Sequence, residues 1–358
     1  MDEAFKPVKT GIIGCGSIGN VHAEQYDETP LAELRTVCDL LPDKAEAVRA
    51  KFGAYRSCVD YRELLADPDI EAVSVCLPND LHHPVTLAAL EAGKHVLCEK
   101  PVALNLAQAT AMRDAARKHG KKLSIGVVNR FNAHVNLLRD FIREGKMGEI
   151  YHVLAMFKNY RSIPGLGGWF TTRARAGGGV MIDWGVHFLD LVLYCLDFPK
   201  LTTLSGAAHC RLAAKPGEYA FLTMWGGKGD RDGVCDVEEY ASGMARTDRG
   251  VSLAFEGAWA QNVGEAQMYI EFLGDKGGAR LHYGGAFTWW HDEGGVLCKT
   301  EPSIQAPSMF LAEIEDFCRS IRTGAASRAD IDTVLDTQAL LDAFYRSDAE
   351  KREVAVFG

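Results

Sequence analysis

The sequence predicts an α/β protein of two domains: an N-terminal doubly wound parallel sheet, then an α/β domain with a large, mostly antiparallel open sheet. At 358 residues the chain exceeds one core of ordinary size. Short apolar runs alternate with helical patterns up to Val128, and strands and turns dominate later. We therefore expect domains of residues 1–128 and 129–358, with the closing helices free to pack back on the first domain.

In the first domain, five apolar runs are the expected strands: Thr10–Ile13, Leu34–Cys38, Ala72–Leu77, His95–Cys98 and Leu123–Val127. The expected helices lie between them: Ser17–Tyr26, Lys44–Phe52, Tyr61–Leu65, His82–Glu91 and Leu106–His119. Such alternation predicts right-handed βαβ units and a parallel sheet covered on both faces. Asn105 is suited to cap the last helix, and Gly120 to end it.

The second domain begins with an expected helix, His134–Arg143, a strand, Ile150–Phe157, and a long helix, Gly178–Leu196. Six further strands are expected: Ala220–Trp225, Val237–Arg246, Val251–Trp259, Gln267–Leu273, Gly278–Tyr283 and Phe287–His291. Turn sequences separate several of these strands, which favours antiparallel pairing. Two helices, Phe310–Arg322 and Ile331–Ser347, close the chain.

Charge and composition narrow the possible partners. The net charge of −9 argues against nucleic acid and anionic membranes. We expect no membrane span, because Asp190 interrupts the longest apolar stretch, and the N-terminus lacks the pattern of a signal peptide. Ten irregularly spaced cysteines indicate free thiols in a reducing cytoplasm.

A glycine-rich turn follows the first strand. Gly14, Gly16 and Gly19 fit the spacing G-x-G-x-x-G, and Ser17 and Ile18 open the next helix. In this context the glycines permit a tight turn, backbone approach to a pyrophosphate, and close packing of helix on strand. A pyrophosphate would lie at the helix N-terminus, where N–H groups are unpaired. The alternative is a glycine-rich turn that binds nothing.

An acid at the end of the second strand strengthens the first interpretation. Asp39 lies 20 residues beyond Gly19, at the position where a carboxylate accepts the hydroxyls of an adenosine ribose. The same carboxylate would repel a 2′-phosphate, and no adjacent arginine could receive one. We therefore predict NAD rather than NADP.

Two later strands end in polar residues at the same edge of the sheet, where ligands bind. The third strand leads into Leu77, Pro78 and Asn79, followed by His82 in the next helix. The fourth leads into Glu99-Lys100-Pro101. A lysine held there could bind a substrate hydroxyl and lower its pKa. The alternatives are a solvated helix start for His82 and an ordinary surface lysine for Lys100.

A third group lies in the long helix of the second domain. Asp183 and His187 are four residues apart and share a helix face with Asp190. A histidine oriented by a carboxylate is suited to take a hydroxyl proton during hydride transfer. The alternatives are a metal pair, for which no third ligand is evident nearby, and a structural His–Asp bond.

Together these motifs, with Asn129-Arg130-Phe131, resemble the glucose-fructose oxidoreductase, inositol dehydrogenase and MocA-type family over nearly the whole chain. The resemblance implies a Rossmann domain, a second domain whose open sheet builds a dimer or tetramer, and catalysis by Lys100, Asp183 and His187. It also implies that Glu99 contacts the nicotinamide ribose, that Arg130 lies near nicotinamide and substrate, and that the Lys100–Pro101 peptide is cis.

The loop before Asp183 is rich in glycine and proline, as expected of a shaped binding loop. Trp169 is suited to stack on a sugar ring, and Arg161 and Thr171 to bind hydroxyls, with Tyr160 beside them. Alternatively, Trp169 is a core residue. We expect the substrate pocket in the cleft between the domains and no metal site.

The sequence therefore predicts an NAD-dependent dehydrogenase that oxidises a secondary hydroxyl of a sugar or glycoside, with C3 of a glucose-type ring favoured. An inositol 2-dehydrogenase is the first alternative. A glycoside-cleaving enzyme that oxidises C3 transiently is the second. A non-catalytic sensor is disfavoured because Lys100, Asp183 and His187 are all present.

Overall fold

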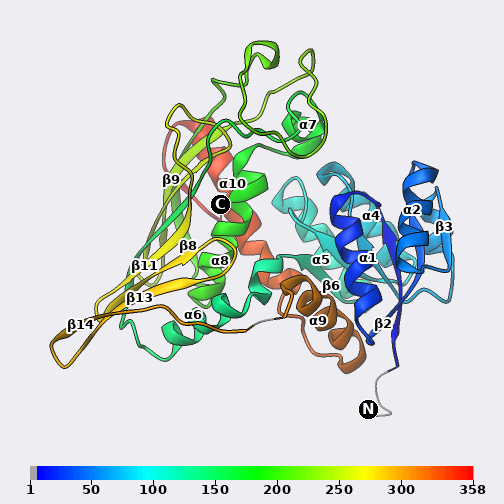
Figure 1. Ribbon diagram of the computed structural model, residues 1–358, viewed down its shortest axis with the longest axis horizontal. Coiled ribbons are helices and arrows are strands. Elements are labelled where there is room, and N and C mark those ends of the chain that lie inside the picture. The colour runs from blue at the N-terminus through cyan, green and yellow to red at the C-terminus, as the bar shows by residue number, and fades with distance from the viewer. Residues whose placement is uncertain (1–5, 306, 358) are drawn as a thin grey trace. The chain divides into compact units, whose positions relative to one another are not determined.

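A computed structural model describes residues 6–305 and 307–357, and within them the chain forms two compact units (Figure 1). The first unit combines residues up to 131 with residues 307–335. The second combines residues 132–305 with residues 336–357. The closing part of the chain thus contributes to both units.

The first unit is built on a six-stranded parallel sheet in the order β3-β2-β1-β4-β5-β6. Its strands are β1 (Val8–Ile13), β2 (Ala32–Cys38), β3 (Arg56–Cys58), β4 (Ala72–Val75), β5 (His95–Glu99) and β6 (Leu123–Gly126). The order reverses between β1 and β4, so the carboxyl ends of these strands form the crevice in which open α/β sheets bind ligands. This confirms the predicted doubly wound sheet.

The helices of this unit are α1 (Ser17–Glu28), α2 (Pro42–Phe52), α3 (Tyr61–Leu65), α4 (Asn79–Glu91), α5 (Leu106–His119) and α9 (Met309–Thr323), with a 3-10 turn at Val128–Phe131. The expected caps of α5 are present: the Asn105 side chain accepts a hydrogen bond from the Gln108 N–H, and Gly120 is left-handed. From the far end of the sequence, α9 buries Phe317 against the core of the first unit.

The second unit is built on a nine-stranded sheet in the order β14-β13-β12-β11-β7-β10-β9-β8-β15. Its strands are β7 (Ile150–Lys158), β8 (Leu201–His209), β9 (Tyr240–Thr247), β10 (Ser252–Ala258), β11 (Gln267–Gly274), β12 (Gly277–His282), β13 (Phe287–Glu293), β14 (Val296–Thr300) and β15 (Val354–Ala355). Within the described residues of this second sheet, only β7 and β10 pair in parallel. The predicted, mostly antiparallel open sheet is confirmed.

Helices cover one face of this sheet (Figure 1). They are α6 (Ala133–Arg143), α8 (Val186–Cys195) and α10 (Ile331–Glu350). The unit also contains α7 (Arg173–Ala176), which contacts the short turn at Trp169–Thr171, and further short turns at Met181–Gly185 and Pro216–Glu218. Phe157 of β7 packs against Phe188 of α8, and Phe255 of β10 packs against Phe344 of α10. Aromatic residues therefore fix α8 and α10 on the sheet.

Two predicted elements differ from the structure. Ala220–Trp225 is not a strand, because it runs along a loop: the Leu222 N–H bonds the Arg161 carbonyl, and the Gly165 N–H bonds the Trp225 carbonyl. The expected long helix, Gly178–Leu196, consists of a π-turn at Met181–Gly185 followed by α8, and a glycine-rich break separates it from α7. Gly177, with φ at +85°, ends α7 in a left-handed conformation.

The same region contains the one described helical segment that bears on the expectation about membrane spans. Arg173–Cys195 is long and apolar enough to cross a membrane by length and composition alone. Its most apolar window is 83% buried within the protein, as in the core helix of a globular fold. All ten cysteines carry free thiols, as predicted.

Candidate active site

The glycine turn between β1 and α1 is shaped by two very close backbone contacts. Gly14 has φ at +102°, and a Cβ atom there would lie 2.2 Å from the Cys76 carbonyl oxygen. A Cβ atom on Gly19 would lie 1.9 Å from the Gly14 carbonyl oxygen. Both glycines are therefore required by the fold itself.

Gly16 is different, because a Cβ atom there would meet no atom of residues 6–305 and 307–357 within 4 Å. Its φ of −75° is also open to other residues. Gly16 is the N-cap of α1, and no side chain caps the helix there. Ser17 is exposed and Ile18 half-buried, so the first turn of α1 faces open space. The turn thus has the form of an anion cradle at a helix N-terminus.

Asp39 lies beside this cradle at the end of β2. One carboxylate oxygen accepts the Cys15 N–H and the other accepts the Leu41 N–H, both at 2.9 Å. The backbone thereby holds the carboxylate next to the glycine turn. Each oxygen keeps a lone pair for a further donor, such as a ribose hydroxyl.

His82 joins the two loops that follow β4 and β5. It is fully buried, with Nδ1 2.6 Å from the Pro101 carbonyl oxygen and Nε2 2.8 Å from the Leu77 carbonyl oxygen. Because a carbonyl oxygen can only accept, both ring nitrogens must donate, and the ring is an imidazolium. Burial alone would lower the pKa of His82, but Cys98 and the two carbonyls raise it to about 9.

His82 therefore holds the loops of the cofactor edge rather than presenting a free ring to a ligand. Leu77, Pro78 and Asn79, which it fixes, are all half-buried at the start of α4. This corrects the expectation that the His82 ring itself binds the cofactor. The loops that it joins remain the parts of the edge available to a ligand.

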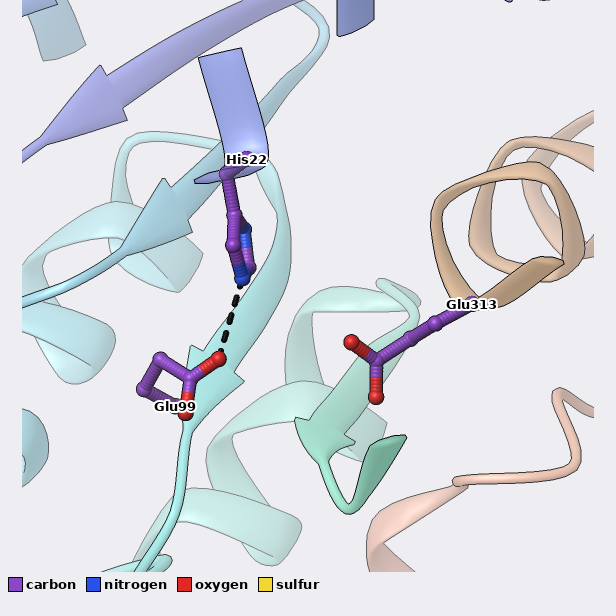
Figure 2. A group of neighbouring side chains, drawn as sticks. All are labelled: His22, Glu99 and Glu313. Atoms are coloured by element: carbon purple, nitrogen blue, oxygen red, sulfur yellow. Dashed lines mark hydrogen bonds and ion pairs between the residues drawn. The ribbon is translucent and has the colours of Figure 1, made fainter. Parts of the chain in front are cut away.

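Glu99 and Lys100 end β5. The Glu99 carboxylate is buried, and Oε1 lies 2.9 Å from His22 Nε2 (Figure 2). Its other oxygen accepts the Lys100 N–H at 3.1 Å. The Lys100–Pro101 peptide is cis, as the family resemblance implied, and Lys100 is half-buried. The sequence analysis missed His22, although its place on the buried face of α1 was a usable signal.

Asn129 and Arg130 are both buried in the turn after β6. The Arg130 guanidinium donates to the Thr333 hydroxyl at 2.6 Å and to the carbonyls of Arg328 and Thr333. It thus ties the end of the first sheet to the start of α10 and to the residues just before it. This corrects the expectation that Arg130 contacts the substrate, because these bonds occupy its guanidinium inside the protein.

Asp183 lies in the π-turn and is buried. The indole N–H of Trp259, which follows β10, donates to its Oδ2 at 3.0 Å. His187, half-buried in the first turn of α8, has its ring 6.2 Å from that of Tyr283. Sequence analysis missed Trp259 and Tyr283, because neither is near Asp183 in the chain. A wide π-turn is frequent where side chains must be redirected for function.

The start of this helical segment is anchored by a second buried acid. Glu238 accepts the N–H groups of Gly179 at 2.9 Å and Met181 at 3.1 Å, and the Tyr345 hydroxyl at 2.8 Å. Burial raises the pKa of Glu238. Asp190, further along α8, accepts the Thr337 hydroxyl at 3.0 Å and is buried, so it has a structural role.

The predicted substrate loop contains one residue with a different role. Thr171 is fully buried, and its hydroxyl donates to the Val234 carbonyl at 2.8 Å. This corrects its assignment to substrate hydroxyls. Tyr160 and Arg161 are half-buried, and Arg161 bonds Asn262. Trp169 is half-buried and stacks on its neighbour Phe170 at 3.9 Å between ring centroids.

These features define a class of protein: an oxidoreductase with an NAD-binding Rossmann domain. Residues 8–127 match the model of the "Oxidoreductase family, NAD-binding Rossmann fold", and residues 135–280 match the "GFO/IDH/MocA C-terminal domain". The chain belongs to the glucose-fructose oxidoreductase, inositol dehydrogenase and MocA family.

Named relatives act on sugars and cyclitols. The D-glucoside 3-dehydrogenase of Escherichia coli K12 is 33% identical over 344 residues, which cover 95% of each chain. The inositol 2-dehydrogenase of Rhizobium meliloti is 28% identical over 98% of this chain and 99% of its own length. A levoglucosan dehydrogenase solved with NADH and levoglucosan has the same fold, with a TM-score of 0.87, 21% identity and coverage of 99% and 100%.

The charge on His82 predicts a pH-dependent stability. Its pKa is about 9 in the folded protein against 6.5 as the ordinary value. The stabilisation is thus complete below about pH 6.5 and is lost as the pH rises towards about 9, amounting to roughly 3 kcal/mol. In urea unfolding, His82→Gln should remove this alkaline loss, whereas His83→Gln should retain it. Equal pH dependence in His82→Gln and the wild type would contradict the assignment.

The open space at Gly16 predicts a binding defect without a folding defect. Gly16→Ala should keep the wild-type melting temperature but weaken NAD binding at least tenfold, about 1.4 kcal/mol, because its methyl group enters the space of the pyrophosphate. Titration calorimetry measures the affinity. Gly264→Ala, at another position where a Cβ atom has open space, is the matched control. Unchanged NAD affinity in Gly16→Ala would refute this cradle.

Proposed function

We propose that the protein is an NAD-dependent dehydrogenase that oxidises a secondary ring hydroxyl of a sugar or glycoside, with C3 of a glucose-type ring favoured. The observation that carries the proposal is the 33% identity to a D-glucoside 3-dehydrogenase over 95% of both chains. Lys100 at the carboxyl edge of the Rossmann sheet, with Asp183 and His187 around the π-turn, supports it.

The cofactor would be held by the glycine turn, by Asp39, by the loops at Leu77–Asn79 and Glu99–Lys100, and by Asn129 in the turn after β6. When bound, NAD accepts the hydride released from the carbinol carbon. Among the residues of this edge, Glu99 is assigned to the nicotinamide ribose. The Glu99 carboxylate points into the protein, and the residue is only 7% exposed. We therefore expect Glu99 to contact the ribose only through the small part of the residue that is exposed.

Proton handling is assigned to three side chains. The Lys100 ammonium binds the reacting hydroxyl and favours its deprotonation. His187 takes the hydroxyl proton as general base, a contribution typically worth about 10²–10⁴ in rate. Asp183, held by the Trp259 N–H, is fixed as the acceptor that orients the imidazole and stabilises its charged form. Tyr160, Arg161 and Trp169 remain candidates for binding the rest of the sugar.

An inositol 2-dehydrogenase is the second candidate. It is favoured by the 28% identity to such an enzyme over nearly the full length of both chains. The two candidates differ in the substrate ring rather than in the proposed roles of Lys100, Asp183 and His187.

The proposed roles predict a loss of turnover without loss of cofactor. Lys100→Ala and His187→Ala should each lower kcat by about 10²–10⁴, because the hydroxyl loses its donor or its base, while NAD binding persists. The assay incubates the enzyme with NAD and monosaccharides, glycosides and inositols, follows NADH absorbance and identifies the products. Near-normal turnover in either variant would overturn its role. Glycoside cleavage without NADH accumulation would establish transient C3 oxidation instead.

We also propose that the uncovered face of the nine-stranded sheet forms a homodimer or homotetramer. This face exposes Trp290 beside the Arg280–Glu271 ion pair, and Met244 further along the sheet on β9. Sedimentation should show a dimer or tetramer, and Trp290→Glu should shift it towards the monomer by placing a charge in the interface. A monomeric wild-type protein would refute the proposal.

A further inference from the structure

A buried cluster of ionisable side chains lies directly behind Glu99 and Lys100. His22 and Tyr26 come from α1, Ser74 from β4 and Glu313 from α9, and all four are at most 1% exposed. Figure 2 shows Glu313 reaching from α9 towards the His22–Glu99 pair. One ring nitrogen of His22 and one carboxylate oxygen each of Glu99 and Glu313 all lie within 4.8 Å of one another.

The hydrogen bonds of this cluster run in one direction and end on Glu99. Tyr26 lies 2.8 Å from the Ser74 hydroxyl, which lies 3.0 Å from His22 Nδ1. Because a carboxylate can only accept, His22 Nε2 donates to Glu99, and Nδ1 of a neutral ring then accepts from Ser74. The chain of donors from Tyr26 to Glu99 is complete with Glu99 as the anion.

Glu313 is the member that this chain leaves unexplained. Neither of its carboxyl oxygens has a hydrogen-bond partner among the described residues, although Glu313 is only 1% exposed. The groups that act on its charge are Glu99 and Asp316, both acids, while Cys76 and Tyr26 also face it. A second buried anion beside Glu99 would be strongly disfavoured.

We propose that Glu313 keeps its proton in the folded protein and donates it in a hydrogen bond towards Glu99, so that Glu313 and His22 are positioning residues for Glu99 and Lys100. A single bridging water, with two hydrogen bonds of about 2.8 Å, spans a separation of this size. Glu99 then accepts hydrogen bonds from His22, from the Lys100 N–H and, through the water, from Glu313. These bonds fix the turn that carries Lys100 from its buried side.

The shape of the pocket supports this role. A Cβ atom on Gly126 would lie 2.7 Å from Glu99 Oε1, so the carboxylate already fills the space against β6. Burial and the charge of Glu99 raise the pKa of Glu313 well above its ordinary value. The positioning of Lys100 rests on the function proposed above, whereas the protonation of Glu313 does not.

Infrared spectroscopy tests the protonation directly. A wild-type minus Glu313→Gln difference spectrum at neutral pH should contain the carbonyl stretch of a protonated carboxylic acid. The matched control Glu315→Gln, an ion-paired glutamate on the same helix, should not remove that band. Absence of the band, or one equivalent of a divalent metal ion in the wild type that Glu313→Gln loses, would overturn the proposal.

The pH dependence of unfolding gives a second, independent readout. Since the folded protein holds a proton that the unfolded chain releases, wild-type stability falls relative to Glu313→Gln as the pH rises from about 5 to about 8. The urea midpoint of Glu313→Gln minus that of the wild type should therefore increase over this range. A constant difference would show that Glu313 is ionised in both states.

The positioning role is tested by two substitutions at one site. Glu313→Gln keeps a neutral donor of the same shape and should retain kcat within about threefold. Glu313→Leu removes the donor and should lower kcat at least tenfold, about 1.4 kcal/mol, at an unchanged Kd for NAD. Equal kcat in the two variants would refute positioning, while the infrared result, which needs no turnover, still decides the protonation.

Discussion

The proposed chemistry of the first unit depends on one close backbone contact. Gly14 lies against the carbonyl oxygen of Cys76, and only a residue without a Cβ atom fits. This contact brings the turn after β1 next to the end of β4, at the point where the strand order reverses. The Gly16 cradle, Asp39 and the Lys100 turn all lie at the carboxyl ends of neighbouring strands of this sheet.

Buried polar groups hold the functional side chains of each unit. In the first unit, the His82 imidazolium joins two loops, and Glu99 accepts hydrogen bonds from His22 and the Lys100 N–H. In the second, Trp259 fixes Asp183, and Glu238 anchors the segment before it. Because an unsatisfied buried polar group costs about 1–3 kcal/mol, such networks tolerate few arrangements. Each unit thus holds the residues proposed to act in the reaction on a rigid support.

Much of this could be predicted from the sequence because it is encoded locally. The glycine spacing, the acid at Asp39 and the alternation of strands and helices depend on residues close together in the chain. The partners of the proposed catalytic groups are distant: Trp259 is 76 residues from Asp183, and His22 is 77 from Glu99. Periodicity carries no signal for such pairs, so they became visible only in the folded protein.

The corrected assignments have the same origin. Arg130 and Thr171 carry polar groups suited to a sugar, but their hydrogen bonds are satisfied inside the protein by Thr333 and Val234. The apolar segment at residues 220–225 has the composition of a strand, yet it lies along a loop rather than a free sheet edge. Residue type indicates what a side chain can do, whereas tertiary contacts decide which of its options remains.

The proposed reaction is hydride transfer from a ring carbon to NAD, and isotope tracing follows that hydride. A glucoside deuterated at C3 is incubated with the enzyme and NAD, and the reduced nucleotide is examined by mass spectrometry. We expect the NADH to carry the deuterium, and turnover to slow with this label but not with a label at C2. Deuterium retained on the sugar at C3 during NADH formation would contradict it.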